Sequence, residues 1–334
     1  MKNICNKIPK IVKIIVLLVI IFIIVWYFPD TKNIKPEYGA TFSAKYARDL
    51  RLNPVKVYDE LINDMGIKKM RLVAYWDEIE REKDNFDFSS LDWQMEMSEE
   101  AGVEVILAIG RRVPRWPECH VPGWANELSH EEKEEELKEF LIAITERYKA
   151  YESLKIWQVE NEVFLNLYAT EICGLEVDDE FIDEEIATVK EIDPSREIMM
   201  TDSGNVGIWS RAYKRGDLFG STFYVYLMFD GGAKSPLTHN VYKFKKWINS
   251  LIFGKKEVYL IEVSIEPWLK DPIATAPIDE LVERLSIERE KVIISRARKT
   301  GFERQYLWGV EWIYYMREKG HPEYWDYFRS VFEG

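Results

Sequence analysis

The sequence predicts an α/β protein, a (β/α)8 barrel preceded by a single N-terminal transmembrane helix. Short apolar stretches rich in β-branched and aromatic residues alternate with longer stretches that carry helix caps. Eight such strand–helix pairs fit into about 300 residues, the usual size of this barrel. A wholly apolar run, Ile14–Phe28, precedes them and is the membrane candidate.

The predicted strands share apolar character and end at polar or small residues. They are Tyr38–Phe42, Lys69–Ala74, Val103–Ile109, the strand starting at Leu154, Arg196–Thr201, Leu218–Tyr224, Val258–Glu262 and Gln305–Gly309. An open doubly wound sheet is the alternative arrangement. No G-x-G-x-x-G or Walker loop follows the first strand, and this disfavours the open sheet.

Capping signals place the helices between the strands. Asn53 and Pro54 start a helix that Gly66 ends, and Ser129 with Glu132 forms a capping box for a helix to about residue 151. Further helices are predicted from Ser89 to Gly102, from Asp178 to Glu191, over Val206–Arg215 and Asn240–Leu251, from Ile278 to before Gly301, and over Pro322–Phe332.

The N-terminus divides into a cytoplasmic basic flank (1–13), a transmembrane signal anchor (14–28) and a linker (29–36), followed by the barrel (37–334). The flank carries four lysines and no acid. Counted from Ile11, the apolar span has 18 residues and reaches about 27 Å as a helix, enough for a bilayer. The basic flank stays inside, so the barrel is expected outside the cytoplasm. A cleaved signal peptide is the alternative, but VWYFPDTKNI offers no small-x-small cleavage site.

Composition excludes several function classes. The formal net charge is −13, so no basic footprint for nucleic acid exists. The four histidines show no H-x-x-x-H spacing, and G-x-S-x-G is absent, which argues against zinc and serine hydrolases. We expect no metal and no cofactor, and a monomeric barrel domain. Outside the cytoplasm a disulfide can persist, and Cys119 and Cys173 each follow a predicted strand, so we predict that they pair.

Two strands end in glutamates that suit glycosidic bond cleavage. The stretch LKIWQVENEVF carries Glu162 after the fourth strand, and VYLIEVSIEPW carries Glu262 at the end of the seventh. In a (β/α)8 barrel these ends line the mouth. One carboxyl group can protonate the leaving oxygen while the other attacks the anomeric carbon. Glu160 and Glu266 are the nearest competitors for the two roles.

These segments resemble the clan A (4/7 superfamily) retaining glycoside hydrolases, such as family 5 cellulases and family 10 xylanases. Asn161–Glu162 is similar to their Asn-Glu pair after strand four, and Ile261–Glu262–Val263 to their nucleophile segment after strand seven. YWDEIEREKDNFDFSSLDW is also similar to a stretch of these barrels. The resemblance implies that Glu162 is the acid/base and Glu262 the nucleophile.

The resemblance also implies the residues that bind substrate or support the two carboxylates. Asn161 contacts the sugar 2-hydroxyl, Arg71 holds Glu262 charged, Tyr224 hydrogen-bonds it, and Trp308 floors the reactive subsite. Tyr226 competes with Tyr224, and Trp312 with Trp308. Glu266 and Trp268 are further substrate-binding candidates, and Trp116 and Trp124 are possible sugar platforms.

The sequence departs from the family pattern after strand three. Family 5 cellulases usually show a His there, whereas this chain has Gly110–Arg111–Arg112 followed by VPRWPECHVPGW. We expect Arg111 and Arg112 to pair with nearby acids. Strand six also lacks the His-x-Tyr of many members, and Ile261 stands where Thr is common. These departures leave the numbered family and the sugar open.

The expected function is that of a membrane-anchored, extracytoplasmic, retaining glycoside hydrolase or transglycosidase that acts on a poly- or oligosaccharide. Its other partner is the lipid bilayer, through the N-terminal helix. The alternative is a catalytically silent, surface-displayed carbohydrate-binding barrel, which needs neither carboxylate.

Overall fold

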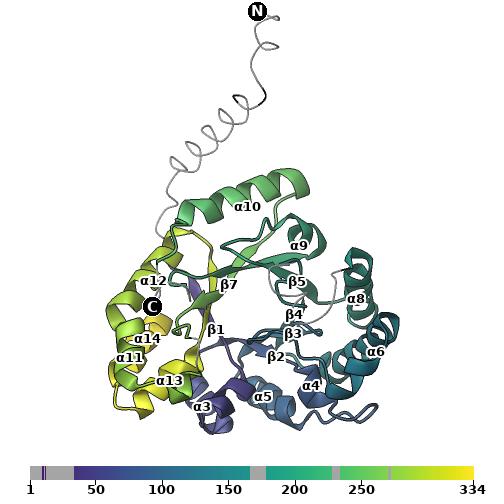
Figure 1. The fold of residues 1–334 in the computed structure, drawn as a ribbon, viewed down its shortest axis with the longest axis horizontal. Coiled ribbons are helices and arrows are strands. Elements are labelled where there is room, and N and C mark those ends of the chain that lie inside the picture. The colour runs from purple at the N-terminus through teal and green to yellow at the C-terminus, as the bar shows by residue number, and fades with distance from the viewer. Residues whose placement is uncertain (1–9, 11, 13–33, 166–177, 228–233, 270–271) are drawn as a thin grey trace, which may run out of the picture.

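A closed parallel barrel forms the centre of the protein. The computed structural model describes residues 34–165, 178–227, 234–269 and 272–334, together with Lys10 and Val12. Eight strands pair in sequence order, and β8 closes the barrel against β1. Helices surround the strands on the outside (Figure 1). The predicted (β/α)8 barrel is confirmed.

The strands lie within one or two residues of their predicted positions. They are β1 (Glu37–Thr41), β2 (Lys69–Val73), β3 (Glu104–Ile109), β4 (Leu154–Val159), β5 (Glu197–Asp202), β6 (Leu218–Phe223), β7 (Val258–Ser264) and β8 (Arg304–Trp308).

Most of the helices lie between consecutive strands and pack on the barrel. The α-helices are α2 (Ala44–Asp49), α3 (Pro54–Asn63), α4 (Trp76–Ile79), α5 (Ser89–Glu100), α6 (His130–Tyr148), α8 (Asp179–Ile192), α9 (Ser210–Arg215), α10 (His239–Phe253), α11 (Ile278–Arg284), α12 (Ile287–Lys299), α13 (Val310–Glu318) and α14 (Pro322–Glu333). Two 3-10 helices, η2 (Gly123–Glu127) and η3 (Ile273–Thr275), lie in loops.

Local side-chain chemistry explains several helix starts. Both hydrogen bonds of the Ser129–Glu132 capping box are present at α6. The Asn53 side chain accepts from two backbone N–H groups at the start of α3, where Pro54 needs no donor. The single helix predicted after Ile278 is in fact two helices, because the chain leaves helical geometry at Leu285.

The core has two layers. A large apolar cluster joins the outer face of the strands to the helices. A separate buried cluster takes residues from six strands, as expected for side chains that fill a barrel interior: Ile106, Ile156, Met199, Leu218, Tyr259, Ile261 and Tyr306. Polar residues follow at the carboxyl ends of the strands, so this end carries the candidate site.

The predicted membrane anchor, residues 14–28, lies outside the described residues, as does nearly all of its basic flank. In the part of the chain that the structure describes, no helix combines the length and the apolar character needed to cross a membrane.

Candidate active site

Arg71, on β2, is fully buried and joins three strand ends. Its guanidinium donates three hydrogen bonds of 2.7 Å, from Nε to Oε1 of Gln158, from Nη2 to Oδ1 of Asn161, and from Nη1 to Oε1 of Glu262. Because one planar group holds all three acceptors, Arg71 fixes the ends of β4 and β7 relative to each other. The predicted contact between Arg71 and Glu262 is present.

Glu262 lies on β7 and is only 1% exposed. Its Oε1 accepts from Arg71, and its Oε2 accepts a hydrogen bond of 2.9 Å from the Tyr224 hydroxyl. The guanidinium compensates a negative charge on this carboxylate, and both oxygens have donors. Tyr224, rather than Tyr226, therefore makes the predicted hydrogen bond. This environment suits a carboxylate that must stay ionised.

Glu162 follows β4 in a sharp turn, where its φ is +44°. Its backbone N–H donates to Oγ1 of Thr201, and its Oε1 accepts from Oγ1 of Thr222 at 2.9 Å. Burial, followed by the carboxylates of Glu118 and Glu262, raises the pKa of Glu162 well above its usual value. A carboxyl group whose pKa is raised in this way can act as a general acid.

The two glutamates lie close together beside the carboxyl end of β6. Thr222, within β6, donates to Glu162, and Tyr224, which directly follows β6, donates to Glu262. The Glu262 carboxylate is also one of the charges that raise the pKa of Glu162. The two carboxyl groups therefore share one space, as a pair that acts on a single glycosidic bond must.

Asn161 offers a hydrogen-bond donor inside this space. Its Oδ1 accepts from Arg71, while its Nδ2 is buried and has no hydrogen-bond partner among the described residues. A buried amide N–H₂ is costly to leave unpaired. A sugar hydroxyl beside the reacting carbon would satisfy it, and the predicted contact of Asn161 with the sugar 2-hydroxyl stays a prediction.

Glu160, the competitor of Glu162, has a structural role. It is fully buried, and its two carboxylate oxygens accept the backbone N–H groups of Arg111 and Arg112 at 2.9 and 2.8 Å. A Cβ at Gly110 would lie 2.5 Å from Glu160, so the close approach requires glycine. Glu160 thus anchors the loop after β3 and is not open to substrate.

The loop after β3 brings in a glutamate that sequence reasoning missed. Arg112 and Cys119 form an antiparallel β-bridge, and this hairpin carries Glu118 with a positive φ of 66°. Arg112 donates to Glu118 at 3.2 and 3.3 Å. Burial raises the pKa of Glu118, and the Glu262 carboxylate adds to this rise. The site therefore holds a third carboxyl group, in the loop where the sequence departs from the family pattern.

Arg115, also missed, occupies the space above Trp308. Its Cζ lies 4.2 Å from the Trp308 ring, and its Nη1 donates to Oε1 of Glu266 at 2.5 Å. Trp308 is 5% exposed, and its Nε1 donates to the same Glu266 oxygen. Arg115 thus covers one face of the Trp308 ring, the role of Trp308 as the floor of the reactive subsite stays a prediction, and Glu266 serves a buried ion cluster with Glu311.

Trp268 is better placed than Trp308 to contact a bound sugar. It is 36% exposed, and its ring packs edge-on against Tyr224 with 5.0 Å between centroids. An indole beside Glu262's hydrogen-bond donor can contact a bound sugar. Trp124 instead packs against Trp76 and donates to the Glu80 carbonyl, so it is structural.

Two other strand-end residues also support the loops. Asp202 accepts the backbone N–H groups of Ser203 and Trp209, which fixes the turn after β5. The guanidinium of Arg111 lies over the Phe181 ring and beside the carboxylate of Glu160. The expectation that Arg111 and Arg112 pair with acids agrees with these positions and with the Arg112–Glu118 salt bridge.

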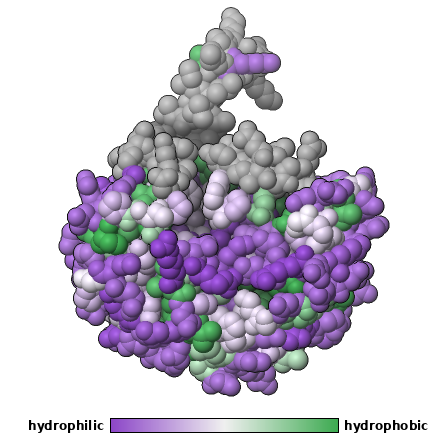
Figure 2. All heavy atoms as spheres, turned by 60° about the horizontal axis from the view of Figure 1, so that its bottom comes forward, coloured by the Kyte–Doolittle hydropathy of each residue, from purple (hydrophilic) through white to green (hydrophobic). Residues whose placement is uncertain are grey.

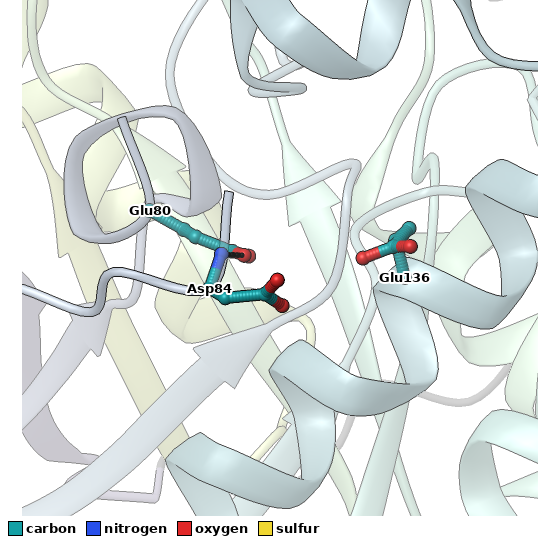
Figure 3. A group of neighbouring side chains, drawn as sticks. All are labelled: Glu80, Asp84 and Glu136. Carbon is teal, nitrogen blue, oxygen red and sulfur yellow. Dashed lines mark hydrogen bonds between the residues drawn. The ribbon is translucent and has the colours of Figure 1, made fainter. Parts of the chain in front are cut away.

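An acidic group elsewhere has donors suited to a cation, namely Glu80, Asp84 and Glu136 (Figure 3). Glu80, however, already accepts from the Trp76 indole and from the Asp84 backbone N–H. Glu136 pairs with Lys83. Both oxygens of Glu80 and one oxygen of Glu136 therefore already have protein donors, so the three carboxylates alone do not indicate a metal centre.

The structure describes only one of the two cysteines of the predicted disulfide. Cys119 lies on the hairpin after β3, next to Glu118, whereas Cys173 lies outside the described residues. The pairing of Cys119 with Cys173 stays a prediction.

Known structures share this barrel. A family 5 (subfamily 18) enzyme of Bifidobacterium longum in complex with Manβ1-4GlcNAc superposes with a TM-score of 0.57 at 12% identity, covering 82% of this chain and 68% of that one. Xylanase 10B of Thermotoga petrophila, in complex with xylobiose, gives 0.54 at 15% identity, with 84% and 86% covered. The exo-β-1,4-mannosidase of Opitutaceae bacterium strain TAV5 gives 0.56 at 15% identity, with 82% and 51% covered. At these identities the likeness establishes the fold.

Sequence comparison identifies the family. No curated protein matches this chain significantly. The model of the family described as Cellulase (glycosyl hydrolase family 5) matches residues 34–228, more than half of the chain, from β1 to just beyond β6. The match includes Arg71, Asn161, Glu162 and Tyr224, and the predicted clan A membership is confirmed. The chain therefore belongs to glycosyl hydrolase family 5 and is an O-glycosyl hydrolase by family.

Proposed function

We propose that this protein is a membrane-anchored, extracytoplasmic glycoside hydrolase or transglycosidase that acts with retention of configuration. The observation that carries the proposal is the pair of buried carboxyl groups beside the carboxyl end of β6, in opposite environments. Glu262 receives a guanidinium and a hydroxyl, while Glu162 lies among other carboxylates and has a strongly raised pKa. This division suits a nucleophile and a general acid.

The reaction follows from these environments. A Glu262 oxygen attacks the anomeric carbon and forms a glycosyl ester, while the proton of Glu162 moves to the leaving glycosidic oxygen. The ionised Glu162 then takes a proton from water, or from a sugar hydroxyl in transfer, and this oxygen displaces Glu262. Asn161 Nδ2 donates to the sugar hydroxyl, and Trp268 packs on the bound saccharide.

A poly- or oligosaccharide is the proposed substrate. Structural neighbours with this barrel include an exo-β-1,4-mannosidase and an endo-β-1,4-xylanase. A β-glycoside is accordingly the first class to test. The barrel is proposed to act as a monomer, without metal or organic cofactor.

The proposed location is the outer side of the cytoplasmic membrane, with the N-terminus inside. The support is the sequence of residues 1–28, four lysines followed by an unbroken apolar run. A Cys119–Cys173 disulfide would fit the oxidising environment there.

The experiment is hydrolysis of an aryl β-glycoside panel by the full chain and by Glu262→Gln. Glu288→Gln, a change at a side chain that is 75% exposed on α12, is the matched control. We expect hydrolysis by the parent and the control and loss of turnover in Glu262→Gln. Full activity of folded Glu262→Gln would overturn the nucleophile assignment, and saccharide binding without any turnover by the parent would favour a silent binding barrel.

A further inference from the structure

Helix α10 leaves several large apolar residues exposed, while two of its three buried residues are polar. Its buried residues are Tyr242, Lys243 and Asn249. Its exposed residues include Trp247 at 46%, Leu251 at 68% and Ile252 at 60%. A surface helix of a globular protein normally turns its apolar stripe to the core and its polar stripe to water. The outer face of α10 is therefore suited to an apolar environment.

Exposed apolar residues concentrate here. Of the ten large exposed apolar residues in the described part of the chain from residue 34 onward, six lie on α10 or on the loop before α9: Val206, Ile208, Trp247, Leu251, Ile252 and Phe253. We call these six the α10 surface. The loop lies against the helix, because Asn249 Nδ2 donates to the Ile208 carbonyl. A contiguous apolar surface of this kind marks an interaction site.

Another face of the molecule is different in character. α10 lies at the top of Figure 1. Figure 2 turns the bottom of that view forward, and the described residues on the face that it shows are mainly hydrophilic, with apolar residues in separate spots. The α10 surface therefore differs from this face.

The charges around the α10 surface indicate which kind of partner it fits. Residues 239–256 contain no aspartate or glutamate, in a chain of formal net charge −13. Of their five lysines, Lys243 is buried, and the Nζ atoms of Lys245 and Lys256 donate to backbone carbonyls. Lys255 is exposed directly after the helix, and Lys214 is exposed beside Lys256, whose Nζ donates to the Lys214 carbonyl. Aromatic and aliphatic residues flanked by lysines are typical of helices that lie in the interface of an anionic bilayer.

The position of the linker agrees with a membrane partner. The linker, residues 29–36, can span at most about 28 Å before β1. β1 begins at Glu37, and Arg304 bridges the two acids Glu37 and Glu257, at 3.6 and 2.9 Å. Glu257 follows the end of α10 by four residues. The carboxyl end of α10 and the start of β1 thus lie at the same end of the barrel.

We infer that the α10 surface docks the catalytic barrel onto the anionic lipid surface of the membrane in which the N-terminal segment is anchored. The inference rests on the anchor in the proposed function. A second copy of the chain is the less favoured occupant, because a symmetric contact would place the two lysine-rich helices against each other.

The test measures how deeply α10 sits in lipid. The full chain carrying Cys5→Ser receives one added cysteine, either Ile252→Cys or, as matched control, Val55→Cys. Val55 is 46% exposed at the start of α3, on the other side of the barrel. Each protein is labelled with an environment-sensitive fluorophore and reconstituted into vesicles of zwitterionic lipid, with or without anionic lipid, containing brominated acyl chains. The Cys5→Ser chain without an added cysteine is treated in the same way and gives the background fluorescence.

We expect the label at residue 252 to shift to shorter wavelength and to lose intensity to the bromolipid, more strongly with anionic lipid, while the label at residue 55 does neither. If the chain floats with the vesicles but both labels stay equally unquenched, docking is wrong and the anchor stands. If the chain does not float with vesicles, the anchor fails and docking fails with it. Shielding of residue 252 by self-association without bromolipid quenching would also overturn the inference.

Discussion

Arg71 and Glu262 form a salt bridge of 2.7 Å that is almost completely removed from water, with side-chain exposures of 0% and 1%. The two residues are 191 positions apart in the sequence. A buried ion pair is tolerated only when additional hydrogen bonds satisfy both partners. Here Gln158 and Asn161 accept from the guanidinium, and Tyr224 donates to the carboxylate. The pair therefore fixes Glu262, the nucleophile candidate, relative to the end of β4, which carries the acid candidate Glu162.

Removing Arg71 should destabilise the fold. Arg71→Met leaves the Glu262 carboxylate buried without its counter-charge, and we expect the free energy of unfolding to fall by about 3–5 kcal/mol. Urea denaturation of Arg71→Met, Glu262→Gln and the double variant measures this. Because the two changes remove the same contact, the double variant should lose less than the sum of the single losses. Additive losses would show that the pair does not act as a unit.

Removing the proton of Glu162 should slow the first chemical step. We expect Glu162→Gln to lower kcat by about 10² to 10⁴ on a glycoside with a poor leaving group, the range that general acid catalysis contributes. A dinitrophenyl glycoside needs little protonation, so its glycosylation step should be much less affected. Burst kinetics on both substrates separate the two cases. Equal losses of rate on the two glycosides, or a comparable loss in the control Glu288→Gln, would contradict the assignment of Glu162 as the general acid.

The hydroxyl of Tyr224 should matter and that of Tyr226 should not. A hydrogen bond to a charged group contributes about 1.5–3 kcal/mol, which corresponds to a loss of about tenfold to a hundredfold in kcat/KM for Tyr224→Phe. Tyr226→Phe is the matched control, because Tyr226 lies two residues further on and its ring packs against Arg289. A larger loss in Tyr226→Phe would reassign the donor.

The pH dependence of kcat/KM should report the environment of Glu162. The general acid must be protonated, so activity falls as pH rises through the pKa of Glu162. This pKa is raised by burial and then by the carboxylates of Glu118 and Glu262, so the alkaline limb should lie well above the usual carboxyl value. Glu118→Gln removes one negative neighbour, lowers this pKa and should move the limb to lower pH. A limb that stays in place would exclude Glu118 from the site.

The sequence predicted the barrel closely because buried strands and capped helices leave local signals. The strand positions agree to one or two residues, and the Ser129 capping box forms as expected. Helix α13 was missed because Val310–Met316 is buried all round and therefore shows no amphipathic period. The two short helices α2 and α4 also lack a long apolar stripe.

The site was predictable at strand ends and not in the loops. Arg71 and Glu262 lie two residues before the ends of β2 and β7, Tyr224 directly follows β6, and their contacts follow from barrel topology. Glu118 and Arg115 lie on a hairpin whose path depends on hydrogen bonds from the loop to the distant Glu160. No local sequence pattern predicts such a contact. The covering of Trp308 by Arg115 was missed for the same reason.

Covalent trapping tests most directly that Glu162 and Glu262 act together on one glycosidic bond. The full chain is incubated with an activated 2-deoxy-2-fluoro glycoside of whichever sugar supports hydrolysis, and the labelled peptide is sequenced by mass spectrometry. The account predicts one sugar per chain, bound as an ester at Glu262, formed in the parent and absent in Glu262→Gln. A label on Glu118, Glu160 or Glu266, or continued turnover with no label on Glu262, would contradict it.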